Sequence, residues 1–206
     1  MTFAEKCNKI FDDTVVLYHA TDDVDFQPVV PDGYGDIERI LFAKNWIDAV
    51  QWHLEDIIRD PAIDPVEALA LKRRIDRSNQ ERTDMVERLD SWFLEKYAGV
   101  EAVPDAEINT ESPAWALDRL SILALKIYHM KVETDRPEAE AAHRDRCRAK
   151  LDVLLEQRRD LTEAIDRLLE AYACGRKRMK VYRQMKMYND PSTNPILYGS
   201  GSKSDK

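Results

Sequence analysis

The sequence predicts an all-α protein: an antiparallel helical bundle of four long helices, made of two pseudo-repeated hairpins, with a short helix before them. Apolar residues recur at helical spacing along four long stretches of the 206-residue chain. Only 6 residues are glycine, which suits long helices with few turns between them. The third observation is an internal similarity at a fixed offset, described below. We therefore expect one helical domain over residues 1–198 and a flexible tail over residues 199–206.

The first half of the chain should hold a short helix and one long one. The short helix is expected from Thr2 to about His19, with a loop containing proline and glycine after it. The long helix is expected from Asp36, as its N-cap, to Asp60, because Pro61 cannot continue a helix. Its apolar residues alternate in steps of three and four, and they predict the buried face as Ile40, Ala43, Ile47, Val50, Leu54 and Ile57.

The second long helix should begin after Asp64, an N-cap followed by proline, and run to about Ala98. Gly99 is well placed to end it in a left-handed conformation. These two long helices make the first predicted hairpin, residues 36–99, and residues 99–111 are expected to form a linker.

The remaining two long helices make the second predicted hairpin, residues 112–175. The third opens at Ser112-Pro113, and the fourth runs from about Glu138 to Ala173. Gly175 should kink or break the fourth helix, which otherwise continues toward Tyr188. A basic C-terminal extension over 176–198 follows.

The two hairpins align with each other, without gaps, at an offset of 76 residues. The matches include both helix-stopping prolines and both terminating glycines, and this favours a duplication over a coincidence between two charged helices. The other matched residues are mostly polar or charged. The full set of identities is Leu41 with Leu117, His53 with His129, Pro61 with Pro137, Asp76 with Asp152, Arg82 with Arg158, Asp84 with Asp160, Glu87 with Glu163, Asp90 with Asp166 and Gly99 with Gly175.

Arg82 and Arg158 each interrupt the apolar stripe of a long helix, at matched positions. A guanidinium taken into a core needs carboxylates or several acceptors, because an unpaired buried charge costs several kcal/mol. The matched histidines, His53 and His129, also lie on largely apolar stripes. The acids that we expect as the arginines' partners are Asp76, Asp152, Glu55, Asp56 and Asp118.

Two interpretations of this polar cluster are open. The first is a buried network of salt bridges that fixes the register of the helices. The second is a pseudo-symmetric pocket in which Arg82 and Arg158 bind an anion, with His53 or His129 as the candidate catalytic acid–base. Binding of an anion requires part of the cluster to be open to solvent.

We expect neither a metal nor another cofactor. Carboxylate–histidine metal centres of helical bundles need Glu-x-x-His on two helices, and here only Glu140 and His143 have that spacing. His53 and Asp56 form an alternative pair on one helix face, but valine replaces the acid in the second repeat. The sequence contains no serine–histidine–aspartate order, phosphate-binding loop or dinucleotide fingerprint.

The charge of the chain is unevenly distributed. The net charge is −8, and residues 175–188 hold six basic side chains and no acid, so the rest of the chain carries −14. If this segment is helical, Arg176, Lys180 and Arg183 line one of its faces. The segment then either docks against the acidic body or binds a phosphate-bearing partner.

Composition limits the compartment and the partners. No stretch is long and apolar enough to span a membrane, and the N-terminus lacks a secretion signal. The three cysteines are scattered, so reduced thiols and a cytoplasmic location are expected. The negative charge argues against a nucleic acid partner, and exposed apolar helix faces are compatible with a homodimer.

Several stretches of the chain resemble a family of bacterial proteins catalogued as domain of unknown function 4254. Related segments occur in other uncharacterised bacterial proteins, some associated with surface-sugar biosynthesis. The resemblance implies no established activity, cofactor or catalytic residue. The stretches that carry it are WHLEDIIRDP (52–61), IDRSNQERTDMVERLD (75–90), ESPAWALDRLSILALKIYHM (111–130), QRRDLTEAIDRLL (157–169) and YRQMKMYNDPSTNP (182–195).

From the sequence we therefore expect a cytoplasmic binding or accessory protein that engages an anionic, phosphate-bearing ligand or partner. The competing hypothesis is an enzyme of cell-envelope sugar or nucleotide metabolism that uses the histidine–arginine–aspartate cluster. The expected ligand-binding residues are Arg82, Arg158, Asp76, Asp152, Glu55, Asp56, Arg176, Lys180 and Arg183.

Overall fold

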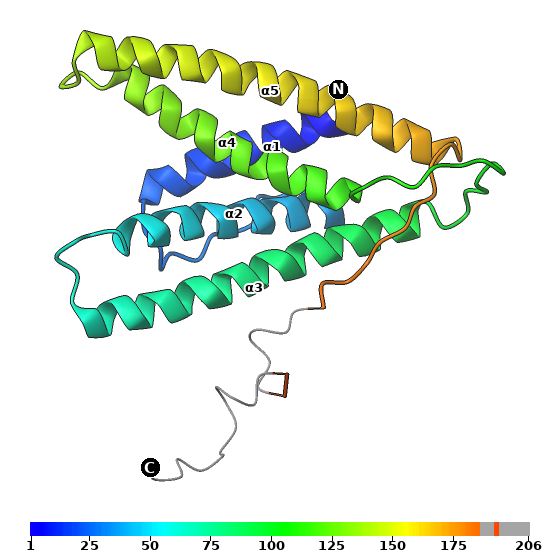
Figure 1. Ribbon diagram of the computed structural model, residues 1–206, viewed down its shortest axis with the longest axis horizontal. Coiled ribbons are helices and arrows are strands. Elements are labelled where there is room, and N and C mark those ends of the chain that lie inside the picture. Colours follow the sequence, from blue (N-terminus) through cyan, green and yellow to red (C-terminus); the bar gives the residue numbers. More distant parts are fainter. Residues whose placement is uncertain (186–191, 194–206) are drawn as a thin grey trace, which may run out of the picture.

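The computed structural model describes residues 1–185 and 192–193 and is all-α, which confirms the predicted fold class (Figure 1). No strand occurs in the described ranges, where the only β pairing is an isolated bridge between Glu107 and Lys177. The predicted tail and the part of the C-terminal extension beyond 185, except 192–193, lie outside the described residues. The helices are α1 (Phe3–Thr21), α2 (Asp36–Ile57), α3 (Pro65–Lys96), α4 (Pro113–Asp135) and α5 (Ala141–Ala173).

Local sequence signals explain where most of these helices begin. The Thr2 side chain accepts the backbone N–H of Glu5 while Glu5 reaches back to the Thr2 N–H, which makes a capping box for α1. The Asp64 carboxylate caps α3 as predicted. The predicted cap of α2 is wrong by one residue, because Gly35 is the N-cap and Asp36 is already helical.

The two glycines that were predicted to end helices behave differently. Gly175 has φ 72° and follows the end of α5 at Ala173, so that helix does not continue toward Tyr188. Gly99 is not in the left-handed region; Tyr97 is the C-cap of α3, and the chain leaves through a turn. The predicted left-handed end at Gly99 is therefore wrong.

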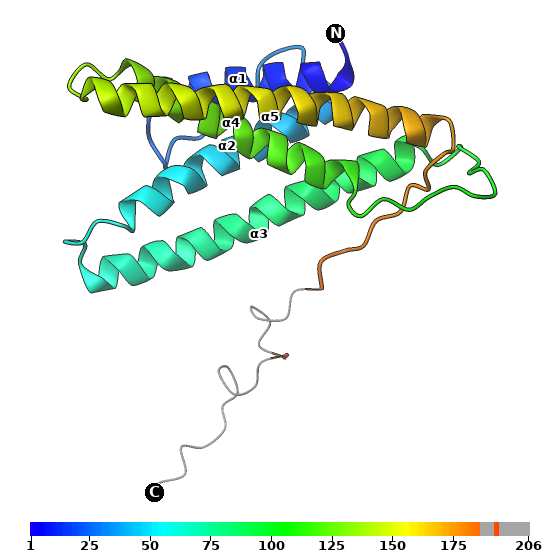
Figure 2. The same cartoon turned by 45° about the horizontal axis from the view of Figure 1, so that its top comes forward.

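Helix α4 is the centre of the fold and contacts all four other helices. In Figure 1, α1, α2 and α4 run in one direction, and α3 and α5 return in the other. Figure 2 shows α3 and α5 on opposite sides of the molecule, so each hairpin contributes one inner and one outer helix. The short N-terminal helix packs against α2, α4 and α5 and buries Cys7, Phe11, Val15 and Tyr18 in the common core.

The buried face of α2 differs from the predicted one. Of the six residues predicted from apolar spacing, only Leu54 is buried, and Ile57 is 46% exposed. The inward face instead carries three polar residues, because α4 supplies partners for them. The buried residues of α2 are Leu41, Phe42, Lys44, Asn45, Trp46, Asp48, Ala49 and Leu54.

The basic segment after α5 is extended rather than helical over residues 178–185. Backbone hydrogen bonds tie its first part to the 99–111 linker, with Val103 N–H donating to Gly175 O at 3.0 Å and Arg178 N–H to Glu107 O at 2.9 Å. The helical face expected for Arg176, Lys180 and Arg183 therefore does not form. None of the described helices is long and apolar enough to cross a membrane.

Replacing Gly175 by alanine should destabilise the fold. At φ 72° a side chain is strained, and a Cβ here would lie 2.3 Å from the backbone oxygen of Glu101. We expect Gly175→Ala to lower the free energy of unfolding by about 2 kcal/mol in urea denaturation. Gly99→Ala is the matched control, because a Cβ there meets no atom of the described part of the chain within 4 Å. Equal stability of the two variants would contradict this account of the α5 terminus.

Candidate functional site

Arg82 lies in a network of four charged residues between α2, α3 and α4. Its Nε and Nη2 donate to the Asp118 carboxylate at 3.1 and 2.6 Å, and Nε lies 3.3 Å from Asp48. Lys44, which is completely buried, pairs with Asp48 and lies 2.7 Å from Asp118. Asp118 is among the partners that the sequence predicts, whereas Lys44 and Asp48 are not. Two cations thus balance two carboxylates in the core.

Neighbouring groups complete the network. Burial raises the pKa of Asp118, but Lys44 and Arg82 outweigh it and hold this pKa below its ordinary value, so the carboxylate stays charged. Ser121 donates its hydroxyl to Asp48 at 2.5 Å, and Asn45 donates to the Ser121 hydroxyl at 2.8 Å. Asn45 and Ser121 occupy equivalent positions in the two predicted repeats, so the two inner helices meet here through matched residues.

Arg158 does not share this network, and its partner is none of the acids that the sequence predicts. Its Nη1 donates to both carboxylate oxygens of Asp12, on α1, at 2.9 Å. The sequence explains the difference. Asp118 in the second repeat is matched by Phe42 in the first, so α2 offers Arg158 no equivalent acid and α1 provides one instead.

Two of the other predicted residues, Glu55 and Asp56, line a pocket of about 250 Å³ together with Arg82 and Trp52. Arg59 is also part of the lining and lies 3.1 Å from the Asp56 carboxylate. The pocket therefore holds both signs of charge. Asp76 and Asp152 are not among the residues that line it; Asp152 is exposed, and Asp76 is partly exposed and pairs with Lys72.

The basic residues predicted to meet an anion lie close to groups of the protein itself. Arg183 donates to the backbone oxygen of Glu87 and to the Ser91 hydroxyl, both at 2.8 Å. Arg176 lies 3.7 Å from Glu170. The Lys180 ammonium lies 5.1 Å from the centre of the Tyr182 ring. This part of the extension is thus docked on the acidic body, in an extended rather than helical form.

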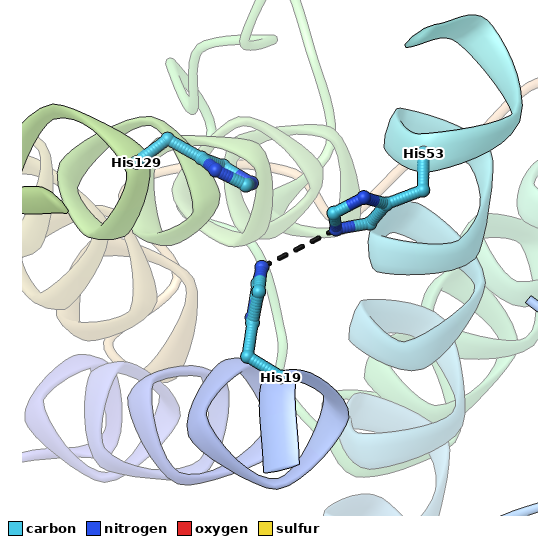
Figure 3. Close-up of side chains that lie close together, drawn as sticks. All are labelled: His19, His53 and His129. Carbon is cyan, nitrogen blue, oxygen red and sulfur yellow. Dashed lines mark hydrogen bonds between the residues drawn. The ribbon is translucent and has the colours of Figure 1, made fainter. Parts of the chain in front are cut away.

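His53 and His129 do come together, and a third histidine joins them. His19 of α1, His53 of α2 and His129 of α4 point toward one another from three helices (Figure 3). The Nε2 atoms of His19 and His53 are 3.2 Å apart. One ring nitrogen from each histidine lies within 4.8 Å of the other two, which makes this set a candidate metal site.

The three imidazoles are held by a cyclic set of stacked aromatic rings. Each histidine follows an aromatic residue in the sequence, and each aromatic ring stacks on the histidine of another helix. Trp52 lies parallel to His129, with an interplanar angle of 6°. The three stacks, with centroid separations, are His19 on Tyr128 at 4.0 Å, His53 on Tyr18 at 4.9 Å and His129 on Trp52 at 4.8 Å.

Hydrogen bonding and burial leave the imidazoles in the form that binds metal. His19 Nδ1 lies 2.7 Å from the Val15 carbonyl oxygen; a carbonyl only accepts, so Nδ1 carries the proton and the lone pair of Nε2 faces His53 Nε2. His129 Nε2 is buried and has no hydrogen-bond partner among the residues that the structure describes. Burial, followed by the proximity of His19 and His53, lowers the pKa of His129 to about 4. Burial and His19 also lower the pKa of His53.

The carboxylate–histidine motifs of helical bundles do not reveal this set, because it consists of one histidine from each of three helices. The signal that could have found it is a dipeptide. An aromatic residue precedes His19, His53 and His129, whereas His143 follows alanine. Periodicity alone could not have shown that these three dipeptides meet.

The sequence model of a family described as protein of unknown function (DUF4254) matches residues 38–181. This match covers both hairpins and two of the three clustered histidines, but not α1. No curated protein and no solved structure matches the chain.

The two arginines should differ in their contribution to stability. Arg82→Ala leaves two buried carboxylates with a single buried lysine, and we expect it to lower the free energy of unfolding by about 3 kcal/mol. Arg158→Ala breaks a pair whose acid is half exposed and should cost less than about 1 kcal/mol. Urea denaturation of both variants measures the difference. If Arg158→Ala were as destabilising as Arg82→Ala, the asymmetry drawn from the structure would be wrong.

Acid should destabilise the metal-free protein through His129. Its pKa is lower in the folded chain than the ordinary 6.5, so the unfolded chain binds this proton first, and stability falls between pH 6.5 and about 4. Because the ring is only half buried, we expect a loss of about 1 kcal/mol. His129→Gln should lose correspondingly less stability between pH 7 and pH 5, measured by urea denaturation in the presence of a chelator. Identical losses would contradict the lowered pKa.

Proposed function

The chain belongs to the DUF4254 family of unknown function, and we propose that it is a metal-binding protein whose centre is His19, His53 and His129. The observation that carries the proposal is the convergence of these three imidazoles, from three helices, on one point. The bound ion would be a divalent transition metal, with zinc best suited to the donors, because imidazole nitrogen favours zinc, copper, iron and nickel over magnesium or calcium.

The surroundings of the histidines support a metal centre rather than a chance cluster. The lowered pKa values of His53 and His129 keep these two imidazoles neutral, which avoids the repulsion that charged rings would suffer at this distance. The ring stacks and the His19–Val15 hydrogen bond fix ring orientations, as partners of metal-bound histidines do. His19 also lies in the last turn of α1, where the helix dipole favours a cation.

A metal on three protein ligands keeps a coordination position open, as in catalytic zinc sites. We propose that this position receives the anionic ligand. The metal, rather than a pair of arginines, would then supply the positive charge that attracts it. This proposal replaces the expectation that Arg82 and Arg158 bind the anion, because these arginines already bind Asp118 and Asp12.

An enzyme is the second candidate, and a specific observation favours it. Trp52 stacks on His129 and also lines the 250 Å³ pocket, which offers Glu55 and Asp56 next to the metal centre. A metal with an open position lowers the pKa of bound water, and nearby carboxylates can then transfer protons. A sugar or nucleotide substrate of the cell envelope is compatible with a pocket of this size.

We further propose a cytoplasmic location, which the three unbridged cysteines support. A homodimer stays a proposal as well, compatible with apolar residues that project outward from α3 and α5, such as Val66 and Val153.

Loss of any one of the three histidines should remove the same metal-binding event. We expect His19→Gln, His53→Gln and His129→Gln each to weaken zinc binding by at least about 100-fold in isothermal titration calorimetry, which corresponds to about 2.7 kcal/mol. The titrations use a Cys147→Ser background, because Glu133, His143 and Cys147 form a second group of possible metal donors. In that background His143→Gln is the matched control, since this histidine lies outside the three-histidine cluster. Circular dichroism establishes that the variants are helical. Zinc binding that is unchanged in all three variants would refute the proposed centre.

The open coordination position of the metal can be tested separately, by absorption spectroscopy of bound cobalt. Cobalt placed in the site of a Cys147→Ser protein should show visible d–d absorption, and inorganic phosphate should change that spectrum if an anion enters the coordination shell. The alternative is that Asp22, which lies 3.9 Å from His53, binds the metal as a fourth ligand and fills the open position. Asp22→Asn tests this alternative by removing the carboxylate. A phosphate response that appears only in Asp22→Asn would mean that the site is closed and structural, against the anion proposal.

A further inference from the structure

A second cluster of donors lies at the turn between α4 and α5. Glu133 comes from the last turn of α4, and His143 and Cys147 lie one turn apart on α5. His143 Nε2 lies 2.8 Å from the Glu133 carboxylate and 3.4 Å from the Cys147 sulfur. One donor atom from each residue lies within 4.8 Å of the other two. None of the three donors belongs to the histidine centre, although Glu133 follows His129 by one turn.

The hydrogen-bond pattern of this cluster is unusual for a purely structural contact. Both the carboxylate and the sulfur face the same nitrogen, His143 Nε2, whereas a single N–H points well at only one acceptor. A catalytic triad would place the acid on the other ring nitrogen, so the arrangement does not fit an activated cysteine. It fits three donors directed at one shared point, which a cation can occupy.

We propose that Glu133, His143 and Cys147 form a second transition-metal site, for zinc or a metal of similar softness. A thiolate, an imidazole and a carboxylate are all zinc ligands, and the thiolate selects against magnesium and calcium. Binding displaces the thiol proton to solvent and leaves the His143 proton on Nδ1, so Nε2, sulfur and a carboxylate oxygen bind the ion.

The site is accessible, and the arginine that pairs with Glu133 can be displaced. Glu133 and His143 are partly exposed, so an ion can reach the cluster, while Cys147 is 6% exposed and shielded from most of the solvent. Arg136 lies 3.1 Å from the Glu133 oxygen that faces His143. Its side chain is 47% exposed, and such a surface pair contributes little stability, so a divalent cation can replace it. The bound ion would join α4 to α5 across their connection.

Cobalt spectroscopy separates this site from the histidine centre. A thiolate bound to cobalt gives a near-ultraviolet charge-transfer band, which a site of three histidines cannot give. We expect the band when cobalt is titrated into the wild-type chain, with two cobalt ions bound in all. Cys147→Ser should abolish the band and reduce the stoichiometry to one.

The chain offers matched controls for this experiment. Cys174→Ser, at the exposed cysteine after α5, should keep the band, and His129→Gln should keep the band while losing the other cobalt ion. Glu133→Gln should weaken cobalt binding at the thiolate site about tenfold. No charge-transfer band in the wild type, or a band that persists in Cys147→Ser, would overturn the second site. If the three-histidine centre did not bind cobalt, the wild-type chain would instead show the charge-transfer band with a single bound cobalt ion.

Discussion

The fold depends on a balanced set of charges buried where α2, α3 and α4 meet. Lys44 and Asp48 come from α2, Asp118 from α4 and Arg82 from α3, so the network exists only when these helices are in register. A one-residue shift of any of them would leave a charge unpaired in the core, which is far more costly than a lost apolar contact. The network therefore specifies the relative position of the two hairpins, and with it the position of every side chain further along the inner helices.

That register is what brings the histidines together. α1, α2 and α4 run in the same direction, so the C-terminal parts of all three helices lie at one end of the molecule (Figure 1). Equivalent residues of α2 and α4 face each other at Asn45 and Ser121 and again at His53 and His129, where the ring centroids are 5.5 Å apart. α1 then adds His19 and the ring of Tyr18. The cluster is thus a product of two matched helices and one unmatched helix, and its chemistry departs from the twofold symmetry of the hairpins.

Part of the site follows from the sequence, and part does not. The alignment of the hairpins singled out His53, His129 and Arg82, and Asp118 was among the acids expected to meet an arginine. It also implied equal surroundings for the two arginines, which the structure does not provide, because Phe42 stands where an acid would be needed and Asp12 of α1 takes that role. Apolar spacing placed the buried face of α2 wrongly, since Lys44 and Asp48 are polar residues that become inward-facing only because their partners are on other helices.

The sequence by itself determined the helices and most of their ends, because caps, prolines and apolar periodicity act between residues a few positions apart. It also determined which residues could carry chemistry. Only the tertiary structure decided which of them meet. His19 and His53 are 34 positions apart, and Asn45 and Ser121 are 76, so their contact depends on helix direction and packing rather than on local preference. Buried charges and metal ligands are both long-range features of this kind. Each is stable only when a distant segment supplies its partner, and no local pattern records which segment that is.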